Sequence, residues 1–513
     1  EHLYRRSLAI SEKVFGPVHR YFAASLSNLG FILLTQGQYA AAEPYFRRSL
    51  AICEKALGPD HPDLAVNLNN LAGLLHEQGK YAAAETLYRR TLHIREKALG
   101  LNHPDVAMSL NNLAMLFKDQ GQSAAAEPFL RRSLGIYEKA LGPDHPDVAL
   151  GLNNLAAILE EQGRYTAAEP LYRRSLVIYE KALGPDHPNV ARSLYNLAIV
   201  LIENGKYANA NAALKRSLGI QSIWLKRELP LLPDQSRSAQ LRQLGDAWQW
   251  PFGLTQAYPP AVQLALETRL NRQGLLQEIE RRQALLLNAP GVERVTVGEV
   301  QALTQQLASV SLSADRRTAL REQRDRLQAQ IYRQIPELQL PLVTSAQVAK
   351  VLPDDGVLVE FQRYQPFDSR KPTEQRWGQA QYIALALKPD GSISAVPLGP
   401  AAEIDATVHK GLRSSAQDLD DAGAIWAQLS ALVLKPLLHE LSGSRQWFLS
   451  PDGELNRVPF AALPAPQQPG KPLAQVVQLR LLTTGRELVR LQQSPVAGSA
   501  AVVMANPSYD RPG

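Results

Sequence analysis

Hydrophobic residues near the start of the chain recur with the spacing of helix faces, in runs that end at glycine. One run ends at Gly79, and its apolar members are Leu64, Leu68, Leu71, Ala72 and Leu75. The next run ends at Gly100, and its members are Tyr81, Ala84, Leu87, Tyr88, Leu92 and Ile94. Both follow the period of an amphipathic helix, and glycine commonly ends helices. The pattern predicts two consecutive helices, which we call helix A and helix B.

This pair of helices repeats along the first 222 residues. The step from Gln36 to Gln78 is 42 residues, and the Gln-Gly pair occurs at Gln36-Gly37, Gln78-Gly79, Gln120-Gly121 and Gln162-Gly163, continued by Asn204-Gly205. A His-Pro pair keeps the same step at His61-Pro62, His103-Pro104, His145-Pro146 and His187-Pro188. One pair of helices cannot bury its apolar faces alone, so we expect neighbouring units to stack into an α-solenoid.

The order of large, small and aromatic residues within a unit resembles the tetratricopeptide repeat family. The matching positions are Leu71, Ala72, Leu75, Gly79, Tyr81, Ala84 and Tyr88. The stretch from Glu138 to Pro146 lengthens the unit and is similar to the kinesin light chain subclass. The resemblance covers about residues 1–222 and implies a superhelix that holds a protein or extended peptide in a concave groove lined by helix A.

Paired asparagines are the first candidates for contacting such a peptide. They occupy equal places in three units, at Asn69-Asn70, Asn111-Asn112 and Asn153-Asn154. An amide offers a donor and an acceptor together, which suits a peptide backbone; equally, one asparagine of each pair could bond between repeats. The resemblance implies that the first of each pair faces the groove. The candidate peptide-binding residues are therefore Asn69, Asn111, Asn153, the weaker candidate Asn196, His76, Lys118 and Glu160.

Two other repeating features have an ordinary structural reading. Successive repeats stack about 10 Å apart, whereas zinc needs each ligand nitrogen at about 2.0–2.1 Å, so the periodic histidines are expected to begin helices and not to bind metal. The Arg-Arg pairs on helix B, such as Arg89-Arg90, predict a solvated face, with an acidic partner as the alternative. No cofactor is expected.

From about Gln221 the 42-residue period disappears. Helices are predicted at Ala261–Leu287 and Ala314–Gln334, so residues 223–340 read as a helical spacer or as the helical leader of the next domain. Residues 341–513 show a different order. Strands are predicted at Val357–Phe361, Tyr382–Leu387, Ile393–Leu398, Gln446–Leu449, Gln475–Leu482 and Ala501–Ala505, with a hairpin turn at Pro389-Asp390-Gly391 and helices at about Ala402–Leu412 and Ala422–Leu441. This order indicates a partial α/β domain.

The stretch from Trp447 to Leu463 resembles the signature of the CHAT domain, a caspase-like module. Further similarity lies at Leu358–Phe361, Thr484–Leu488 and Val502–Pro507. The resemblance implies relatives whose cysteine attacks a peptide carbonyl with a histidine as base. In the family these two residues follow the strand that corresponds to Ala501–Ala505, so no catalytic residue is assigned in this chain.

Two interpretations of the second domain stay open. The favoured one is a piece of a longer cysteine peptidase whose catalytic His and Cys lie beyond this chain, since the chain also opens inside a helix B. The alternative is a non-catalytic interaction scaffold resembling kinesin light chain. The histidines beyond the repeats are His409 and His439. The single cysteine of the chain, Cys53, lies within the repeats.

The composition of the chain indicates which partners and which cellular compartment to expect. The 55 Lys and Arg residues against 49 Asp and Glu give a net charge of +6, which does not indicate nucleic-acid binding, and none is expected. A single cysteine excludes an intramolecular disulfide and a CxxC metal site, which suits the cytoplasm. No apolar run is long enough to span a bilayer, so no membrane partner is expected.

Overall fold

The computed structural model describes residues 2–232, 237, 241, 247–285, 294–307, 314–334, 340–368, 371 and 375–493. It divides into two compact units, Glu1–Ser217 and Leu218–Gly513, which we call unit 1 and unit 2. Each is described by itself. The strand expected at Ala501–Ala505 and the motif at Val502–Pro507 lie outside the described residues.

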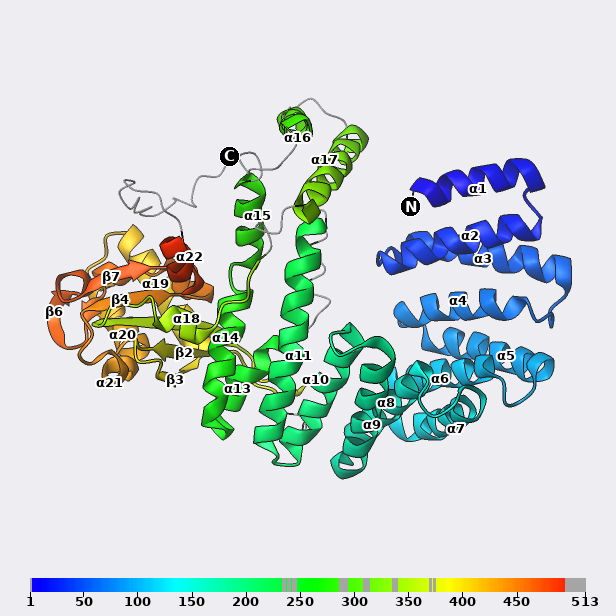
Figure 1. Cartoon of the computed structure of the whole chain (residues 1–513), viewed down its shortest axis with the longest axis horizontal. Coiled ribbons are helices and arrows are strands. Elements are labelled where there is room, and N and C mark those ends of the chain that lie inside the picture. Colours follow the sequence, from blue (N-terminus) through cyan, green and yellow to red (C-terminus); the bar gives the residue numbers. More distant parts are fainter. Residues whose placement is uncertain are drawn as a thin grey trace. The chain divides into compact units, whose positions relative to one another are not determined.

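Unit 1 consists of helices that pack against one another in chain order (Figure 1). They are α1 (His2–Phe15), α2 (Arg20–Thr35), α3 (Tyr39–Leu57), α4 (Leu64–Glu77), α5 (Tyr81–Leu99), α6 (Pro104–Asp119), α7 (Ser123–Leu141), α8 (Pro146–Glu161), α9 (Tyr165–Leu183), α10 (Pro188–Glu203) and the first half of α11 (Tyr207–Glu228). The residues of α11 from Leu218 onward belong to unit 2. The even-numbered helices from α2 to α10 are helix A of their repeats, and the odd-numbered helices are helix B. The predicted helical-repeat solenoid is confirmed.

Glycine and histidine account for the helix ends that repeat along unit 1. Gly79 follows α4 with a φ of 72°, a conformation that glycine adopts without the steric penalty of a side chain. At the other end, the imidazoles of the four His-Pro histidines, and of the equivalent His19 before Arg20, each accept a hydrogen bond at Nδ1 from the backbone N two residues later. These distances are 3.3 Å for His19, 3.2 Å for His61, 3.1 Å for His103, 3.2 Å for His145 and 3.1 Å for His187. His19, His103, His145 and His187 are therefore the N-caps of α2, α6, α8 and α10, whereas the N-cap of α4 is Asp63 and His61 makes the same bond just before it.

A buried hydroxyl ties helix B to the preceding helix A in most repeats. Ser133 Oγ donates to the carbonyl of Ala107 at 2.7 Å, and the same bond recurs from Ser49, Ser175 and Ser217. The remaining repeat carries Thr91, whose hydroxyl instead donates to Leu87 O within its own helix. Because the apolar contacts of each pair continue into the next, one core runs through the stack.

Unit 2 is organised around a mixed five-stranded sheet with the order β3-β2-β1-β4-β7. The strands are β1 (Gly356–Tyr364), β2 (Gln381–Leu387), β3 (Ile393–Pro400), β4 (Gln446–Ser450) and β7 (Gln478–Leu481), and a separate hairpin joins β5 (Pro464–Ala465) to β6 (Gln468–Pro472). β1 pairs antiparallel with β2, whereas β1, β4 and β7 are parallel. The prediction of an α/β region after the repeats is confirmed.

Helices cover both faces of this sheet (Figure 1). They are α19 (Ala401–Ala416), α20 (Ala422–Val433) and α21 (Leu438–Leu441) on one face, and α13 (Trp250–Ala257), α14 (Val262–Arg272), α18 (Ser345–Ala349) and α22 (Arg486–Gln493) on the other. Unit 2 also contains α15 (Leu275–Leu285), α16 (Arg294–Leu307) and α17 (Ala314–Gln334). On β1, Val357 and Phe361 face α19 and α20, while Leu358 faces α14. The alternation follows from the two-residue period of a strand.

Three predicted boundaries in unit 2 differ from those observed. The helix expected at Ala261–Leu287 is interrupted between α14 and α15, where Gly274 has a φ of 64° and a Cβ would lie 2.8 Å from Thr483 Cγ2. The helix expected at Ala422–Leu441 ends at Val433, because Pro436 cannot donate the backbone hydrogen bond that would continue it. The strand expected at Gln475–Leu482 covers Gln478–Leu481 only, after a 3-10 turn over Leu473–Gln475.

Candidate functional site

The paired asparagines form a continuous ladder across unit 1. Asn112 Nδ2 donates to Asn69 Oδ1 at 2.8 Å, and Asn154 Nδ2 donates to Asn111 Oδ1 at 2.8 Å. Asn196 Nδ2 donates to Asn153 Oδ1 at 3.2 Å. We call this set the asparagine ladder. In each rung, the second asparagine of one repeat bonds to the first asparagine of the repeat before it.

The ladder leaves hydrogen-bonding groups unused in each rung. Nδ2 of Asn69, Asn111 and Asn153 donates to no residue in the described part of the chain, and Oδ1 of Asn112, Asn154 and Asn196 accepts from none. None of these atoms is a buried atom without a partner. A rung therefore keeps one donor and one acceptor for a ligand while its other two groups hold the repeats together. Both readings of the asparagine pairs, as ligand contacts and as links between repeats, fit this geometry.

The other three candidate residues contact protein groups about two turns further along helix A. His76 Nε2 lies 2.8 Å from Asp119 Oδ2, and Lys118 Nζ lies 3.1 Å from Glu161 Oε1, so both link consecutive repeats. Glu160 Oε2 accepts from the hydroxyl of Tyr172 at 3.0 Å. The hydrogen bond from His76 keeps the pKa of Asp119 below its usual value, against the effect of burial. These contacts form a polar border beside the ladder.

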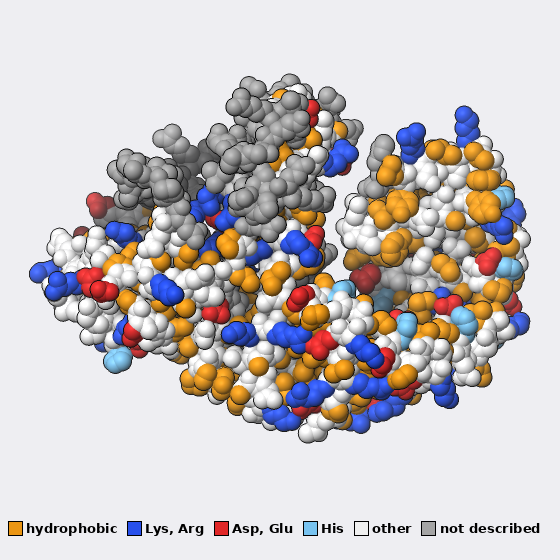
Figure 2. All heavy atoms as spheres, in the orientation of Figure 1, with side chains coloured by type: hydrophobic (Ala, Val, Ile, Leu, Met, Phe, Trp, Pro, Cys, Tyr) orange, Lys and Arg blue, Asp and Glu red, His pale blue; other side chains and the backbone are white. Residues whose placement is uncertain are grey.

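The Arg-Arg pairs of helix B are engaged within the chain. The first arginine pairs with a glutamate four residues earlier, as Arg89 Nε does with Glu85 Oε1 at 2.8 Å. The second reaches the preceding helix B, as Arg90 Nη1 does with Glu54 Oε1 at 2.6 Å. Blue and red side chains accordingly alternate on the visible face of unit 1 in Figure 2. This arrangement favours the solvated-face interpretation over an acidic partner.

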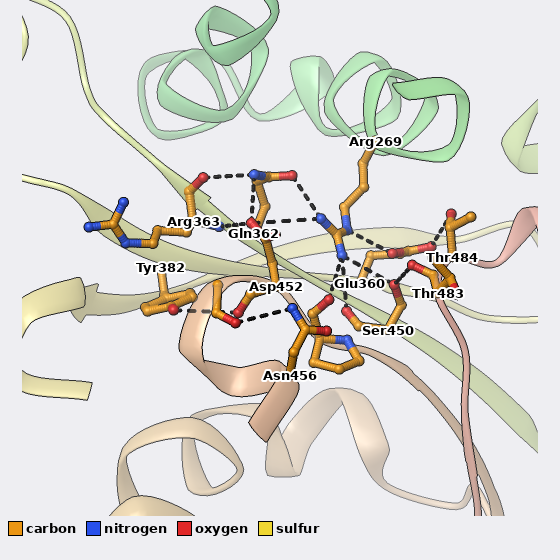
Figure 3. A network of polar contacts seen from close by, with 12 residues as sticks. Arg269, Glu360, Gln362, Arg363, Tyr382, Ser450, Asp452, Asn456, Thr483 and Thr484 are labelled. Carbon is orange, nitrogen blue, oxygen red and sulfur yellow. Dashed lines mark hydrogen bonds and ion pairs between the residues drawn. The ribbon is translucent and has the colours of Figure 1, made fainter. Parts of the chain in front are cut away.

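The most extensive polar cluster in the described part of unit 2 surrounds Arg269 on α14 (Figure 3). Its Nε donates to Glu360 Oε2 at 2.7 Å, and its Nη1 donates to Gln362 Oε1 at 2.9 Å. Its Nη2 reaches Ser450 Oγ at 3.1 Å and the carbonyl of Pro451 at 3.0 Å. Since Arg269 is 1% exposed, a buried charge has its donors satisfied by groups on β1 and at the end of β4.

Glu360 extends this cluster to the start of α22. Its Oε1 accepts from Thr484 Oγ1 at 3.0 Å and from the backbone N of Gly485 at 2.6 Å. On the other side, Asp452 Oδ2 accepts from Gln362 Nε2 at 2.9 Å and from the backbone N of Arg363 at 2.8 Å. The cluster therefore joins α14, two parallel strands and α22, and every named group has a protein partner. Its role in the described residues is structural.

Neither the cysteine nor the late histidines form a catalytic pair in the described residues. Cys53 lies on α3, is 6% exposed, and burial raises the pKa of its thiol, which disfavours the reactive thiolate. His409 Nε2 contacts Glu454 Oε2 at 2.9 Å, and His439 Nδ1 contacts Glu440 Oε1 at 3.2 Å. Cys53 belongs to unit 1, whereas both histidines belong to unit 2.

The described residues contain no group of three or more His, Cys, Asp or Glu side chains that could hold a metal ion. Histidine side chains are spread over the visible face of unit 1 in Figure 2. Among the described helices, none combines the length and the apolar character that crossing a bilayer requires.

Models of known protein families match two parts of the chain. The tetratricopeptide repeat model matches residues 1–55, 21–97, 68–139, 105–176 and 147–222, and the CHAT domain model matches residues 424–512. The chain therefore contains tetratricopeptide repeats in residues 1–222 and a match to the CHAT domain in residues 424–512. The matches confirm both family resemblances, and they place the asparagine ladder within the repeats and Asp452 within the CHAT match.

Several solved structures resemble the repeats. BtubC (BKLC) from P. vanneervenii shares 24% identity, covering 42% of this chain and 86% of that chain, with a TM-score of 0.38. A putative kinesin light chain from Podospora anserina with nearly identical TPR-like repeats shares 26% identity, covering 40% and 97%, with a TM-score of 0.36. A Rap protein complexed with competence and sporulation factor shares 15% identity, covering 54% and 80%, with a TM-score of 0.35. The search of curated proteins returned no significant match.

The sequence analysis does not single out Arg269, which lies in the segment interpreted as a helical spacer or leader. A signal was present in its partner. Glu360 interrupts the otherwise apolar run Val357–Phe361, and a carboxylate in a buried strand needs a cation or several donors. Which arginine would supply it could not be read from the sequence, because the preceding helices are rich in arginine.

Proposed function

We propose that the tetratricopeptide repeats bind an extended segment of another protein across their helix A surfaces. The observation that carries the proposal is the asparagine ladder, which leaves one donor and one acceptor unused in each rung. A peptide backbone also presents one donor and one acceptor per residue. The ladder can therefore hold main chain without selecting its side chains.

The repeat spacing suits an extended ligand. Stacked helices lie about 10 Å apart, and an extended chain rises about 3.3 Å per residue, so one rung would serve about three peptide residues. A helical ligand rises only about 1.5 Å per residue and satisfies its own backbone groups. An extended segment thus matches both the spacing and the chemistry of the ladder.

Apolar side chains beside the ladder supply a second type of contact. Val66 on α4 is 57% exposed and Met108 on α6 is 36% exposed, and each lies about one helical turn before its asparagine pair. Phe31 on α2 is 50% exposed and occupies the turn after Ser27, which accepts from Asn70. In the proposal these residues contact peptide side chains, while the ladder contacts the peptide backbone.

All seven candidate residues keep a place in this proposal. Asn69, Asn111 and Asn153 donate to the ligand, and Asn196 presents the acceptor of the last rung. His76, Lys118 and Glu160 form the polar border on which charged ligand side chains would be selected. Their existing contacts with Asp119, Glu161 and Tyr172 hold them in place.

The substitution Asn111→Asp tests the role of the free donor. An aspartate at this place still accepts the bond from Asn154 and so keeps the rung, but it loses the Nδ2 donor offered to a ligand. Peptides selected on the full chain from a random library would be measured for binding to both forms by fluorescence anisotropy. We expect a loss of about fivefold to tenfold per substitution, with an unchanged melting temperature.

A matched control lies on the opposite helix of the neighbouring repeat. Arg89→Gln on α5 removes an exposed charge without touching the ladder, so its peptide affinity should equal that of the wild type. If Asn111→Asp and Asn153→Asp both retained full affinity, while Arg89→Gln lost it, the ligand would bind the helix B surface and the proposal would be wrong.

We further propose that the repeats recruit their partner to the CHAT domain, which the family relates to caspase-like cysteine peptidases. The contribution of the chain's own residues is recognition. Cleavage chemistry is not assigned to Cys53, because it is buried within the repeats and its thiol is disfavoured as a thiolate. The single cysteine suits a reducing, cytoplasmic location.

A further inference from the structure

A pocket of about 440 Å³ lies in unit 2 between α15, α22 and the segment 340–343. Its volume falls in the range of small-molecule sites. The charged side chains that line it are Arg281, Arg282, Arg486, Arg490, Glu278 and Glu487. Four positive and two negative charges leave an excess of two positive charges around one small cavity.

The two glutamates are already occupied. Glu278 Oε1 accepts from Arg281 Nη2 at 2.7 Å and from Arg282 Nε at 2.8 Å. Burial opposes the ionised form of Glu278, but these two arginines outweigh it and lower its pKa to about 2. Glu487 Oε1 accepts from the backbone N of Thr483 at 3.0 Å. Glu278 therefore pairs with Arg281 and Arg282, and Glu487 holds the start of α22. In the described residues Arg486 makes no ion pair, and Arg490 makes only a long one with Glu278.

Arg486 has a donor that no described group uses. Its Nη2 donates to the carbonyls of Gln273 and Gly274, both at 3.2 Å, which fixes the guanidinium against the end of α14. Its Nη1 is buried and has no hydrogen-bond partner in the described part of the chain. Arg490 Nη1 lies 3.9 Å from Glu278 Oε2, beyond hydrogen-bond distance. Within the described residues, Arg486 therefore has one buried donor without a partner, and Arg490 has only a long ion pair with Glu278. Both residues line the cavity.

The buried lysine Lys226 lies next to the pocket and is affected by the positive charges of its arginines. Lys226 is 4% exposed, and its Nζ donates to Asn271 Oδ1 at 2.7 Å and to the carbonyl of Pro341 at 2.6 Å. Pro341 itself lines the pocket. Burial, with the nearby charges of Arg486 and Arg282, lowers the pKa of Lys226 to about 7. An anion in the pocket would relieve the repulsion that these cations exert on one another.

We propose that this pocket binds a phosphorylated small molecule. A phosphate monoester carries about two negative charges near pH 7, which matches the excess charge of the lining, and its oxygens suit the fork of donors on arginine. Leu340, Val343 and Val489 line the same cavity and would contact the apolar part of the molecule. The proposal is independent of peptide binding, because all lining residues belong to unit 2.

Phenyl phosphate is a suitable probe because it combines a phosphate dianion with an apolar ring. Titration calorimetry on the full chain should show saturable binding at one site. Arg490→Gln should weaken it by about tenfold, which corresponds to losing one charge-assisted contact. Arg486→Gln should weaken it at least as much. The side chain of Arg490 is 33% exposed and makes no hydrogen bond in the described residues, so its substitution should leave folding intact.

Arg457→Gln is the matched control, since Arg457 is an exposed arginine of unit 2 away from the pocket. It should bind phenyl phosphate like the wild type. Equal binding by Arg490→Gln and the wild type would overturn the proposal, as would binding of inorganic phosphate as tight as that of phenyl phosphate, which would indicate an unspecific anion site. Loss of binding in Arg457→Gln as well would attribute the signal to general charge and would also overturn it.

Discussion

Arg269 on α14 and Glu360 on β1 form a 2.7 Å ion pair whose two side chains have no solvent exposure, although 91 residues separate them in the sequence. A buried ion pair is costly unless its remaining donors and acceptors are satisfied. Here Gln362, Ser450 and Pro451 take the other donors of Arg269, and Thr484 and Gly485 donate to Glu360. Directly or through Glu360, Arg269 thereby links α14 to β1, to the end of β4 and to the start of α22.

Removing the arginine should strongly destabilise unit 2. Arg269→Ala would leave the Glu360 carboxylate buried without its cation, which typically costs about 3–5 kcal/mol of unfolding free energy. All six tryptophans of the chain lie in unit 2, so tryptophan fluorescence during urea denaturation reports that unit. The exposed Arg413 on α19 gives the control, and Arg413→Gln should leave the midpoint unchanged. A midpoint for Arg269→Ala within error of the control would show that the pair contributes little.

The repeats could be predicted closely because each unit carries its own local signals. Gly79 and the apolar runs on either side of it mark the helix boundaries, and the same signals return 42 residues later. In unit 2 the strands before Pro400 were also predictable from their apolar runs and from the turn at Gly391, whose backbone N donates to Lys388 O at 3.0 Å. The break at Gly274 has a local signal in the glycine itself, whereas the close approach of Thr483, which leaves no room for a side chain there, comes from a residue distant in sequence.

At the candidate sites, too, the sequence indicates individual residues but not which distant residues the fold brings together. The sequence indicated which asparagines recur, but the rung from Asn69 to Asn112 spans one repeat plus one residue and depends on how two helices stack. The arginine-lined pocket depends on α15 and α22, about 200 residues apart. Its charges are ordinary surface residues in the sequence, and only the fold places Arg281 beside Arg486.

Replacing an N-cap histidine should cause a small loss of stability that depends on the hydrogen-bond acceptor of the new side chain. His145→Ala removes the acceptor that the backbone N of Asp147 uses at 3.2 Å and should cost about 1 kcal/mol, as other N-cap deletions do. His145→Asn should recover most of that loss, because asparagine is a favourable N-cap acceptor. Urea denaturation followed by circular dichroism would compare the three proteins. Equal destabilisation by alanine and asparagine would mean that the imidazole acts by packing and not as a cap.

Glu43 should make a pH-dependent contribution to the stability of unit 1. Hydrogen bonds from Arg47 first, then from Gln78 and Lys80, lower its pKa to about 2 from a usual value of 4.5. The pKa is lower in the folded state, so its contribution is present above about pH 4.5 and disappears as pH falls towards 2. The melting temperature of Glu43→Gln should therefore lie below that of the wild type at pH 7 and converge with it near pH 2.

The equivalent glutamate of the next repeat provides the comparison for Glu43. Among the contacts of the described residues, Glu85 accepts only from Arg89. Glu85→Gln should therefore show a smaller difference from the wild type at pH 7, of a few tenths of a kcal/mol for an exposed helix pair. If the two substitutions gave the same difference at every pH, the contacts of Glu43 with the following repeat would contribute nothing.

Lys226 predicts a pH-dependent change of stability in unit 2, with the same sign as that of Glu43 but at higher pH. Its pKa is lowered from 10.5 to about 7, so between these values the unfolded chain binds a proton that the folded chain does not. The free energy of unfolding should therefore rise as pH increases from about 7 to about 10.5, and Lys226→Met should lose that rise. Tryptophan fluorescence during urea denaturation at several pH values measures it, with the exposed Lys410→Met as control. A rise of equal size in Lys226→Met and in the control would assign the dependence to another group, and the ammonium of Lys226 would then not be disfavoured by the arginines of the pocket.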